Sequence, residues 1–389
     1  MKKTIGTEKL PIRMWLDDVE EGALAQAKNL ANYPYAFKHI ALMPDCHKGF
    51  GMPIGGVMAT REVIVPNAVG VDIGCGMCAV QTSLTDVSGK QLIDLLNGIR
   101  SQIPLGHRHH KNSQDLSRMP GTGGRGPMPV VEREFRSATR QIGTLGGGNH
   151  FIEIQKGSDG QLWIMIHSGS RNIGKQVADH YNRQAVKLNE KWGSHVPRSH
   201  QLAYLPLDSE EGRRYIREMN YCVDFAFASR KLMMDRTIRV FESVAGKGFK
   251  TAPMINIAHN YAAFENHFGE DVVVHRKGAT KADKNTTGII PGSQGANSYI
   301  VKGKGNPDSF ESCSHGAGRA MGRKEAIRSL DLAAEVEKLE KKGVLHALHS
   351  QRDLEEAASA YKDIALVMEL QRDLVDVVVE LTPLAVIKG

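Results

Sequence analysis

The sequence predicts an α+β fold, and three observations support this prediction. Short apolar runs rich in Val, Ile and Met predict strands. Longer stretches with polar and apolar residues at helical spacing predict helices. The connections between them are irregular, without the regular alternation of strand and helix that builds a doubly wound parallel sheet. Because the 389 residues contain no internal repeat, low-complexity tract or long linker, we expect one compact domain spanning 1–389.

Six segments are predicted to be helices: 18–31, 88–100 after a Ser88 cap, 172–191, 208–245, 330–342 and 363–380. Six apolar runs are predicted to be strands: 39–43, 55–60, 77–82, 151–155, 162–167 and 271–275. Most of these runs are followed at once by Gly, His or Asp, so the polar motifs are expected at strand ends. Residues 106–129 lack periodicity and are predicted to form an exposed, mobile loop.

The composition is that of a soluble globular protein, with 41% hydrophobic and 24% charged residues and a mean hydropathy of -0.32. No apolar run approaches the roughly 18 residues that a membrane-spanning helix needs. Lys2 and Lys3 are followed by acidic residues rather than an apolar segment, so no signal peptide is predicted and we expect a cytoplasmic protein. The five cysteines are scattered, which predicts reduced thiols rather than a disulfide framework.

The charge indicates the kind of partner. A formal charge of +7 and a pI near 9.0 favour a polyanionic partner such as nucleic acid. Glycine is also enriched, with 40 residues that gather in clusters. Clustered glycines indicate binding sites built from the backbone.

A candidate metal centre is spread over four segments. Asp72 and Cys75 lie three apart in the glycine-rich stretch VGVDIGCGMC, and His150, His167 and His259 stand beside glycine or at strand ends. Any one of these histidines alone is more often a hydrogen-bonded core residue. Together the five side chains could hold two adjacent divalent ions if the thiolate bridges, and the ligand types suit Zn²⁺, Co²⁺, Mn²⁺ or Fe²⁺.

The overlapping CxxC of Cys75 and Cys78 has two other interpretations, half of a zinc ribbon or a redox pair. No second CxxC is present to complete a Cys₄ site. The mixed metal centre is therefore preferred.

The sequence contains no P-loop motif and no K-x-D-G motif with a lysine nucleophile. The stretch SCSHGAGRAMGR offers another nucleophile, His315, because a neutral imidazole can attack phosphorus to form a phosphoramidate. Small residues that follow it would let a phosphate approach. The alternative is a histidine that caps a helix. Upstream, GIIPGSQGANSYIV contains Ser293 and Ser298, which could bind a base or ribose.

Several stretches, taken in order, resemble the RtcB family of RNA ligases nearly from end to end. They are MPDCHKGFGMPIGG, AVGVDIGCGM, LGGGNHFIEI, HSGSRNIG, HNYA, HRKGA, IIPGSQGANSYIV, SCSHGAGR, YKDI and VIKG. The resemblance implies a ligase that joins an RNA 3′-phosphate, or a 2′,3′-cyclic phosphate after its hydrolysis, to a 5′-hydroxyl. It implies GTP and Mn²⁺ as cofactors, a role in RNA repair or tRNA splicing, and an RNA-3′-pp-G intermediate.

The resemblance also assigns residues. Asp72, Cys75, His150, His167 and His259 match the ligands of two Mn²⁺ ions, with Cys75 bridging, and His315 matches the guanylylated histidine. The positions that match the guanosine and triphosphate site are Asn149, Glu153, Ser293, Ser298, Gly316, Ala317, Gly318, Tyr361 and Lys388. Those that match an RNA-phosphate site are Arg171, Arg319 and Arg323. Glu153 and Lys388 can hydrogen-bond the edge of guanine, so GTP should be preferred to ATP.

Some features depart from the family pattern. Cys46 and Cys78 are not required by the mechanism and could compete for metal or confer sensitivity to oxidation. Residues 100–140 resemble other members poorly, and the 106–129 loop is either an RNA-facing lid or a solvated insertion. Asp45 and His47 are expected to support residues that contact the ligands.

Two rival functions use the same residues. A dinuclear metallophosphoesterase would need no covalent nucleotide and would tolerate His315→Ala. An RNA-binding protein with a structural metal would bind RNA without turning over GTP. The sequence leaves open an activating protein partner, and we expect a monomer.

Overall fold

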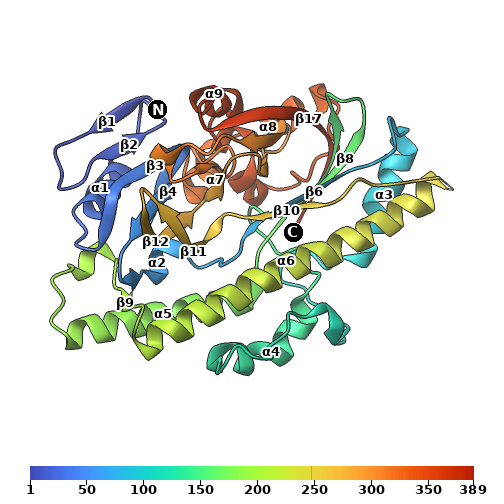
Figure 1. Cartoon of the computed structure of the whole chain (residues 1–389). Coiled ribbons are helices and arrows are strands. Elements are labelled where there is room, and N and C mark those ends of the chain that lie inside the picture. The colour runs from blue at the N-terminus through green and yellow to red at the C-terminus, as the bar shows by residue number, and fades with distance from the viewer. Residues whose placement is uncertain (247) are drawn as a thin grey trace.

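Two large sheets form the centre of the fold, and the structure, a computed structural model, describes residues 1–246 and 248–389 (Figure 1). The first sheet has six strands, antiparallel except where β2 pairs with β3. In spatial order they are β1 (Lys3–Ile5), β2 (Ile12–Met14), β3 (Ala36–Phe50), β4 (Met52–Thr60), β12 (Glu270–Lys277) and β11 (Asn260–His267).

The second sheet has seven strands, all antiparallel. Their spatial order is β10 (Ile255–Ala258), β6 (Gly76–Gln81), β8 (Leu162–Ser168), β7 (Phe151–Gly157), β17 (Val375–Lys388), β15 (Ser298–Gly303) and β14 (Thr287–Ile290). Two short pairs complete the strands: β13 (Ala279–Lys281) with β16 (Ser312–Ser314), and β5 (Val63–Ile64) with β9 (Leu205–Pro206).

The helices surround the sheets, and the longest of them, α6, runs along one side with α5 and α4 beside it (Figure 1). The α-helices are α1 (Glu21–Ala31), α2 (Pro66–Val69), α3 (Gly89–Gln102), α4 (Pro129–Gln141), α5 (Arg171–Lys191), α6 (Glu210–Ala245), α7 (Arg323–Ser329), α8 (Leu332–Lys341) and α9 (Ile364–Leu370). Short 3₁₀ turns occupy Leu116–Arg118, Arg198–His200, Pro307–Ser309, Gln351–Glu356 and Ala358–Ala360. No helix in the described part of the chain is both long and apolar enough to cross a membrane.

The structure confirms the α+β class, the six predicted strands and five of the six predicted helices. The ends of these five helices lie within three residues of the predicted ends. The predicted helix over 363–380 is wrong. Only Ile364–Leu370 is helical, and β17 begins at Val375. The stretch VDVVVE is rich in β-branched residues, which favour a strand, and β15 supplies its hydrogen-bonding partner.

Helix α4 was not predicted, because the irregular loop was expected to reach residue 129 and no helix was expected after it. Pro129 stands at the first helical position. The N–H groups of Val130 and Val131 donate to Glu218 Oε1 of α6, at 2.7 and 2.8 Å. The helix is therefore capped by a residue 87 positions away, which no local pattern reveals. The loop before it is mostly exposed, as predicted, and contains one 3₁₀ turn.

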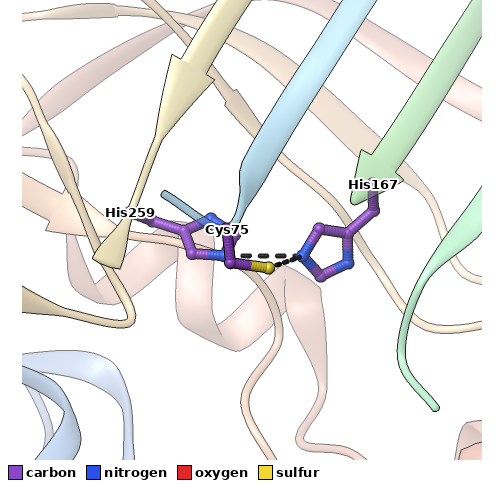
Figure 2. Close-up of side chains that lie close together, drawn as sticks. All are labelled: Cys75, His167 and His259. Carbon is purple, nitrogen blue, oxygen red and sulfur yellow. Dashed lines mark hydrogen bonds between the residues drawn. The ribbon is translucent and has the colours of Figure 1, made fainter. Parts of the chain in front are cut away.

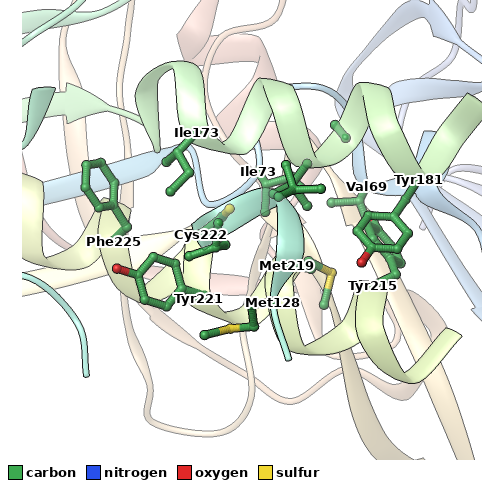
Figure 3. Packing of buried hydrophobic residues seen from close by; sticks show 14 of the residues in the cluster. Val69, Ile73, Met128, Ile173, Tyr181, Tyr215, Met219, Tyr221, Cys222 and Phe225 are labelled. Atoms are coloured by element: carbon green, nitrogen blue, oxygen red, sulfur yellow. The ribbon is translucent and has the colours of Figure 1, made fainter. Parts of the chain in front are cut away.

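A large apolar cluster packs α5 and α6 against the loop that follows α2 (Figure 3). Ile73, between Asp72 and Cys75, is completely buried in this cluster, which also contains Ile173 and Phe225. A Cβ at Gly74 would lie 2.8 Å from Val223 Cα, and Gly74 has φ +74°. The loop that carries two candidate metal ligands is thus held directly against α6, and only glycine fits at its closest point.

Candidate active site

Four segments bring the five candidate metal ligands together at the ends of β6, β7, β8 and β10. Asp72 and Cys75 precede β6, His150 precedes β7, His167 lies in β8, and His259 follows β10. The pairing of β6 with β8 and with β10 fixes their approach, and the His259 N–H donates to the Cys75 carbonyl at 2.8 Å. Figure 2 shows Cys75, His167 and His259 converging.

The ligands form two groups that share Cys75, one with His167 and His259 and the other with Asp72 and His150. Cys75 Sγ lies 3.3 Å from His167 Nε2 and 3.5 Å from His150 Nε2. The Nε2 atoms of His167 and His259 are 3.4 Å apart, and His150 Nε2 is 3.1 Å from an Asp72 oxygen. Two groups with a common thiolate can hold two neighbouring ions.

The hydrogen bonds of two histidines fit metal binding. His150 Nδ1 lies 3.0 Å from the Leu145 carbonyl, and His167 Nδ1 lies 3.1 Å from the Asn149 carbonyl. A carbonyl oxygen only accepts, so each Nδ1 must carry the proton, which leaves a lone pair on each Nε2. Both Nε2 atoms face Cys75 Sγ, and His150 Nε2 also faces Asp72 whereas His167 Nε2 faces His259 Nε2. A cation would stabilise this arrangement.

Burial keeps two of the cluster histidines, His167 and His259, neutral. It lowers the pKa of His167 and of His259 well below the ordinary value, and it raises the pKa of the Cys75 thiol well above it. Neutral imidazole is the form that binds metal, and a bound cation would favour the thiolate.

A buried arginine ties the ligand-bearing loops together. Arg230 of α6 is completely buried and donates through Nη1 to the carbonyls of Gly74 (2.9 Å) and Ser168 (2.8 Å). These carbonyls adjoin the ligands Cys75 and His167. A third bond, from Nε to Asn256 Oδ1, reaches β10.

The remaining cysteines lie outside the cluster. Cys78 is buried in an apolar cluster with its thiol directed at the Arg230 carbonyl, and Cys46 is buried in β3. Burial raises the pKa of each thiol to about 12. Neither belongs to a group of candidate ligands in the described chain, so the structure does not support the expectation that they compete for metal.

His315 follows β16 and stands next to the cluster, with its ring centroid 4.8 Å from that of His259. Its Nδ1 lies 2.6 Å from Asp45 Oδ2, and its backbone N–H donates to the same oxygen at 3.1 Å. Although burial opposes ionisation, the charge and hydrogen bond of His315 hold the pKa of Asp45 below its usual value. The carboxylate therefore keeps the proton of His315 on Nδ1 and leaves the lone pair on Nε2.

A cleft opens beside His315 and reaches His167 of the metal cluster. Most residues predicted for nucleotide binding line it: Asn149, Glu153, Ser293, Gly316, Ala317, Gly318, Tyr361 and Lys388. His47 also lines it, and its Nδ1 lies 3.0 Å from the Asp45 carbonyl. These residues come from both sheets and from the segment after β16, so the cleft exists only in the folded chain.

Ser298 is the exception among the predicted nucleotide residues. It is buried at the start of β15, outside the cleft lining. Its hydroxyl accepts hydrogen bonds from the Gly292 N–H and from Gln155 Nε2, both at 3.1 Å. Ser298 therefore holds the backbone of Gly292 through a hydrogen bond and does not face the cleft.

The sequence prediction missed Glu356, which lines the cleft and is 4% exposed. Its carboxylate lies 3.1 Å from Lys388 Nζ and 3.3 Å from Arg319 Nη1, and it accepts the Tyr361 hydroxyl. Although burial opposes ionisation, Lys388 and the other partners keep the pKa of Glu356 below its usual value. The only signal in the sequence is its position five residues before Tyr361 of the YKDI stretch.

The three arginines predicted to bind RNA phosphate differ in position. Arg319 and Arg323 line the cleft, Arg319 with its guanidinium 5.0 Å from the Tyr361 ring centre and Arg323 about half exposed. Arg171 lies outside the cleft lining at the start of α5, where it donates to Thr144 Oγ1 and to the Gly106 carbonyl. Arg171 and Arg323 nevertheless flank one glycine-rich turn, because Arg171 lies against Gly146 and Arg323 against Gly148.

A family model described as "tRNA-splicing ligase RtcB" matches residues 26–126 and 122–389. This chain belongs to the RtcB family. The RNA-splicing ligase RtcB of Escherichia coli K12 is 38% identical to this RtcB-family chain over 412 aligned residues, covering 98% of both proteins. The tRNA-splicing ligase RtcB of Thermococcus kodakarensis is 31% identical over 459 residues, covering 98% of this chain and 95% of the relative.

Proposed function

We propose that this protein is an RNA ligase that uses GTP and two Mn²⁺ ions and carries the activated guanylate on His315. The observation that carries the proposal is the placement of an oriented histidine between a five-ligand cluster and a cleft lined with candidate base-binding groups. The names of the relatives agree with RNA ligation.

In the first proposed step, His315 Nε2 attacks the α-phosphorus of GTP. A nitrogen–phosphorus bond forms, the bond from the α-phosphorus to the bridging oxygen breaks, and pyrophosphate leaves. Asp45 orients the ring and stabilises the positive charge that develops on it. When bound, the divalent ions would neutralise charge on the phosphate oxygens.

Base selection is assigned to two residues of the cleft lining, Lys388 and Glu153. Lys388 can donate to O6 of guanine, and Glu153, when ionised, can accept from N1–H and the 2-amino group. Adenine presents the opposite pattern at these positions, so it would leave both groups unpaired. Glu356 holds Lys388 and the Tyr361 hydroxyl in place.

In the second proposed step, an oxygen of the RNA 3′-phosphate attacks the guanylate phosphorus, forming RNA-3′-pp-G and freeing His315. In the third, the 5′-hydroxyl attacks the RNA 3′-phosphorus and GMP leaves. A 2′,3′-cyclic phosphate would first be opened by hydrolysis. Arg171 and Arg323 are the cations best placed to bind the RNA phosphate, since neither guanidinium is as fully engaged as that of Arg319.

The test is incubation with α-labelled GTP and Mn²⁺, followed by a denaturing gel. We expect a labelled band that survives alkali, is lost in acid and is absent from His315→Ala. The exposed His195→Ala serves as the matched control and should label like the wild type. An unlabelled wild type that still releases phosphate from RNA would contradict the guanylate mechanism and favour a metallophosphoesterase.

A further inference from the structure

Two stretches of this chain contain no acidic residue. Leu95–Gln114 includes Arg100, Arg108, Lys111 and three histidines, and Phe135–Ile152 includes Arg136 and Arg140. In a protein with 43 acidic residues among 389, such stretches are unbalanced in charge. The two matched segments of the family model overlap at residues 122–126, which lie between these two stretches.

The fold places these two stretches side by side. The His110 N–H donates to the Arg140 carbonyl at 3.0 Å, and the Gln114 N–H donates to the Thr139 carbonyl at 2.8 Å. Farther along, the Gly106 N–H donates to the Gly146 carbonyl at 2.9 Å. The two stretches therefore lie side by side. We name the exposed residues of 106–114, together with the exposed Arg136 and Arg140, the basic platform; residues 141–146 are buried and support it.

Helix α6 anchors the platform from beneath. Arg236 donates through Nη1 to the Gly143 carbonyl at 3.2 Å, and the same nitrogen lies 2.9 Å from His110 Nε2. Its Nη2 donates to Gln114 Oε1 at 2.5 Å. The anchor is itself a cation, so it adds positive charge while it holds the loop.

The exposed cations of the platform are not neutralised. In the described part of the chain, Arg108, Lys111, Arg136 and Arg140 are exposed and form no ion pair with a carboxylate. Neighbouring arginines outside it do, for example Arg118 with Asp235 at 3.2 Å. Unpaired like charges repel one another, and a polyanion would relieve this repulsion.

The platform begins at the metal cluster. Arg171 Nη2 donates to the Gly106 carbonyl at 3.3 Å, which joins the platform to the start of α5. His109 lies close enough to Arg171 and Arg140 to feel both charges: burial, and then these two charges, lower the pKa of His109. A line of cations thus leads from the candidate metal centre to the end of α4.

We propose that the basic platform binds the backbone phosphates of the RNA strand whose end reacts at the metal centre. This proposal rests on the proposed ligase function and adds the path of the substrate. Arg108 and Arg140 are the outer contacts. The strand is either the one that ends in the 3′-phosphate or the one that begins with the 5′-hydroxyl.

The test is a double variant, Arg108→Ala with Arg140→Ala, in the full-length protein. Its control is Arg61→Ala with Arg198→Ala, which removes two exposed arginines that already pair with acids elsewhere. Binding of two labelled 10-nucleotide RNAs, one ending in a 3′-phosphate and one with a 5′-hydroxyl and no 3′-phosphate, is measured by anisotropy over a range of KCl concentrations. Guanylylation by GTP is measured in parallel.

We expect the double variant to bind at least one RNA about 10-fold more weakly, with a salt slope reduced by about 1.4, since each lost phosphate contact on a single strand accounts for about 0.7. Guanylylation and the control should be unchanged. The RNA that loses affinity identifies the bound strand. Unchanged affinity and slope for both RNAs, with guanylylation intact, would overturn the proposal. A wild type that does not guanylylate would instead refute the proposed function.

Discussion

At the scale of single residues, Asp45 shows how one carboxylate can prepare a nucleophile. It is completely buried and binds both the side chain and the backbone N–H of His315. The same residue touches Gly318, where a Cβ would lie 2.2 Å from the Asp45 carbonyl oxygen. Gly318 has φ +72°, so glycine is required there for the two segments to meet.

We expect Asp45→Asn to slow guanylylation by about 100-fold, because the neutral amide no longer stabilises the positive charge on His315. Mn²⁺ binding should be unchanged, since Asp45 belongs to neither candidate ligand group. The rate of label incorporation and the Mn²⁺ affinity are measured side by side. Asp18→Asn, at an exposed position, is the control. A matching loss of Mn²⁺ affinity would contradict an orienting role.

Glu153 makes stability depend on pH. Burial raises the pKa of its carboxyl from 4.5 to about 8. Between these values the folded protein holds a proton that the unfolded chain has lost, so this group makes the free energy of unfolding fall as pH rises. The slope is at most about 1.4 kcal/mol per pH unit.

Glu153→Gln removes this titration. We therefore expect the variant to gain thermal stability relative to wild type as pH rises from 5 to 8, measured as the difference in Tm in metal-free buffer. Above about pH 8 the difference should level off. A difference in Tm that is the same at pH 5 and pH 8 would show that Glu153 titrates normally.

At the scale of elements, the contact between β6 and β10 holds the cluster together. Gly76 begins β6, and a Cβ there would lie 1.9 Å from the Ile257 carbonyl oxygen. Cys75 directly precedes β6, and His259 directly follows β10. Close backbone approach therefore determines the position of two candidate ligands.

We expect Gly76→Ala to lower the free energy of unfolding by about 1–3 kcal/mol, as overpacking typically does, and to weaken Mn²⁺ binding. Gly89→Ala is the matched control because nothing lies within 4 Å of a Cβ at the start of α3. That variant should be neutral or up to about 1 kcal/mol more stable. Equal stability of the two variants would mean that β6 and β10 can separate without consequence.

The wrong helix over 363–380 also belongs to this scale. Ile364–Leu370 does form a helix, but the Val residues after Leu374 enter an antiparallel sheet between β15 and β7. Periodicity alone could not separate these alternatives, because Val375 and Val379 are buried with three exposed residues between them, a spacing of four that a helix would also show. The neighbouring strands decided the outcome.

At the scale of the whole molecule, the metal cluster joins segments from residue 72 to residue 259 and should therefore contribute to global stability. A ligand that binds only the folded state stabilises it by about 2.7 kcal/mol at 100 times its Kd. We expect Mn²⁺ to raise the Tm of the wild type and EDTA to lower it.

Cys75→Ser should abolish most of this Mn²⁺-dependent rise in Tm, because Cys75 belongs to both candidate groups. Cys78→Ala should retain it, since Cys78 lies in an apolar cluster. Differential scanning fluorimetry over a Mn²⁺ titration distinguishes the variants. Loss of the response in Cys78→Ala as well as in Cys75→Ser would support the CxxC interpretation.

The sequence by itself determined the residue types and local conformations. Glycine-rich turns, β-branched strands and the presence of Asp, Cys and His at strand ends follow from neighbours in the chain, and they predicted both the fold class and the candidate ligands. Only the tertiary structure decided which groups meet. Three features depend on contacts between separate segments of the chain: the capping of α4 by Glu218, the ion pair between Lys388 and Glu356, and the buried position of Ser298. Such contacts form because folding buries polar groups, and each buried group must then find a partner that the local sequence does not specify.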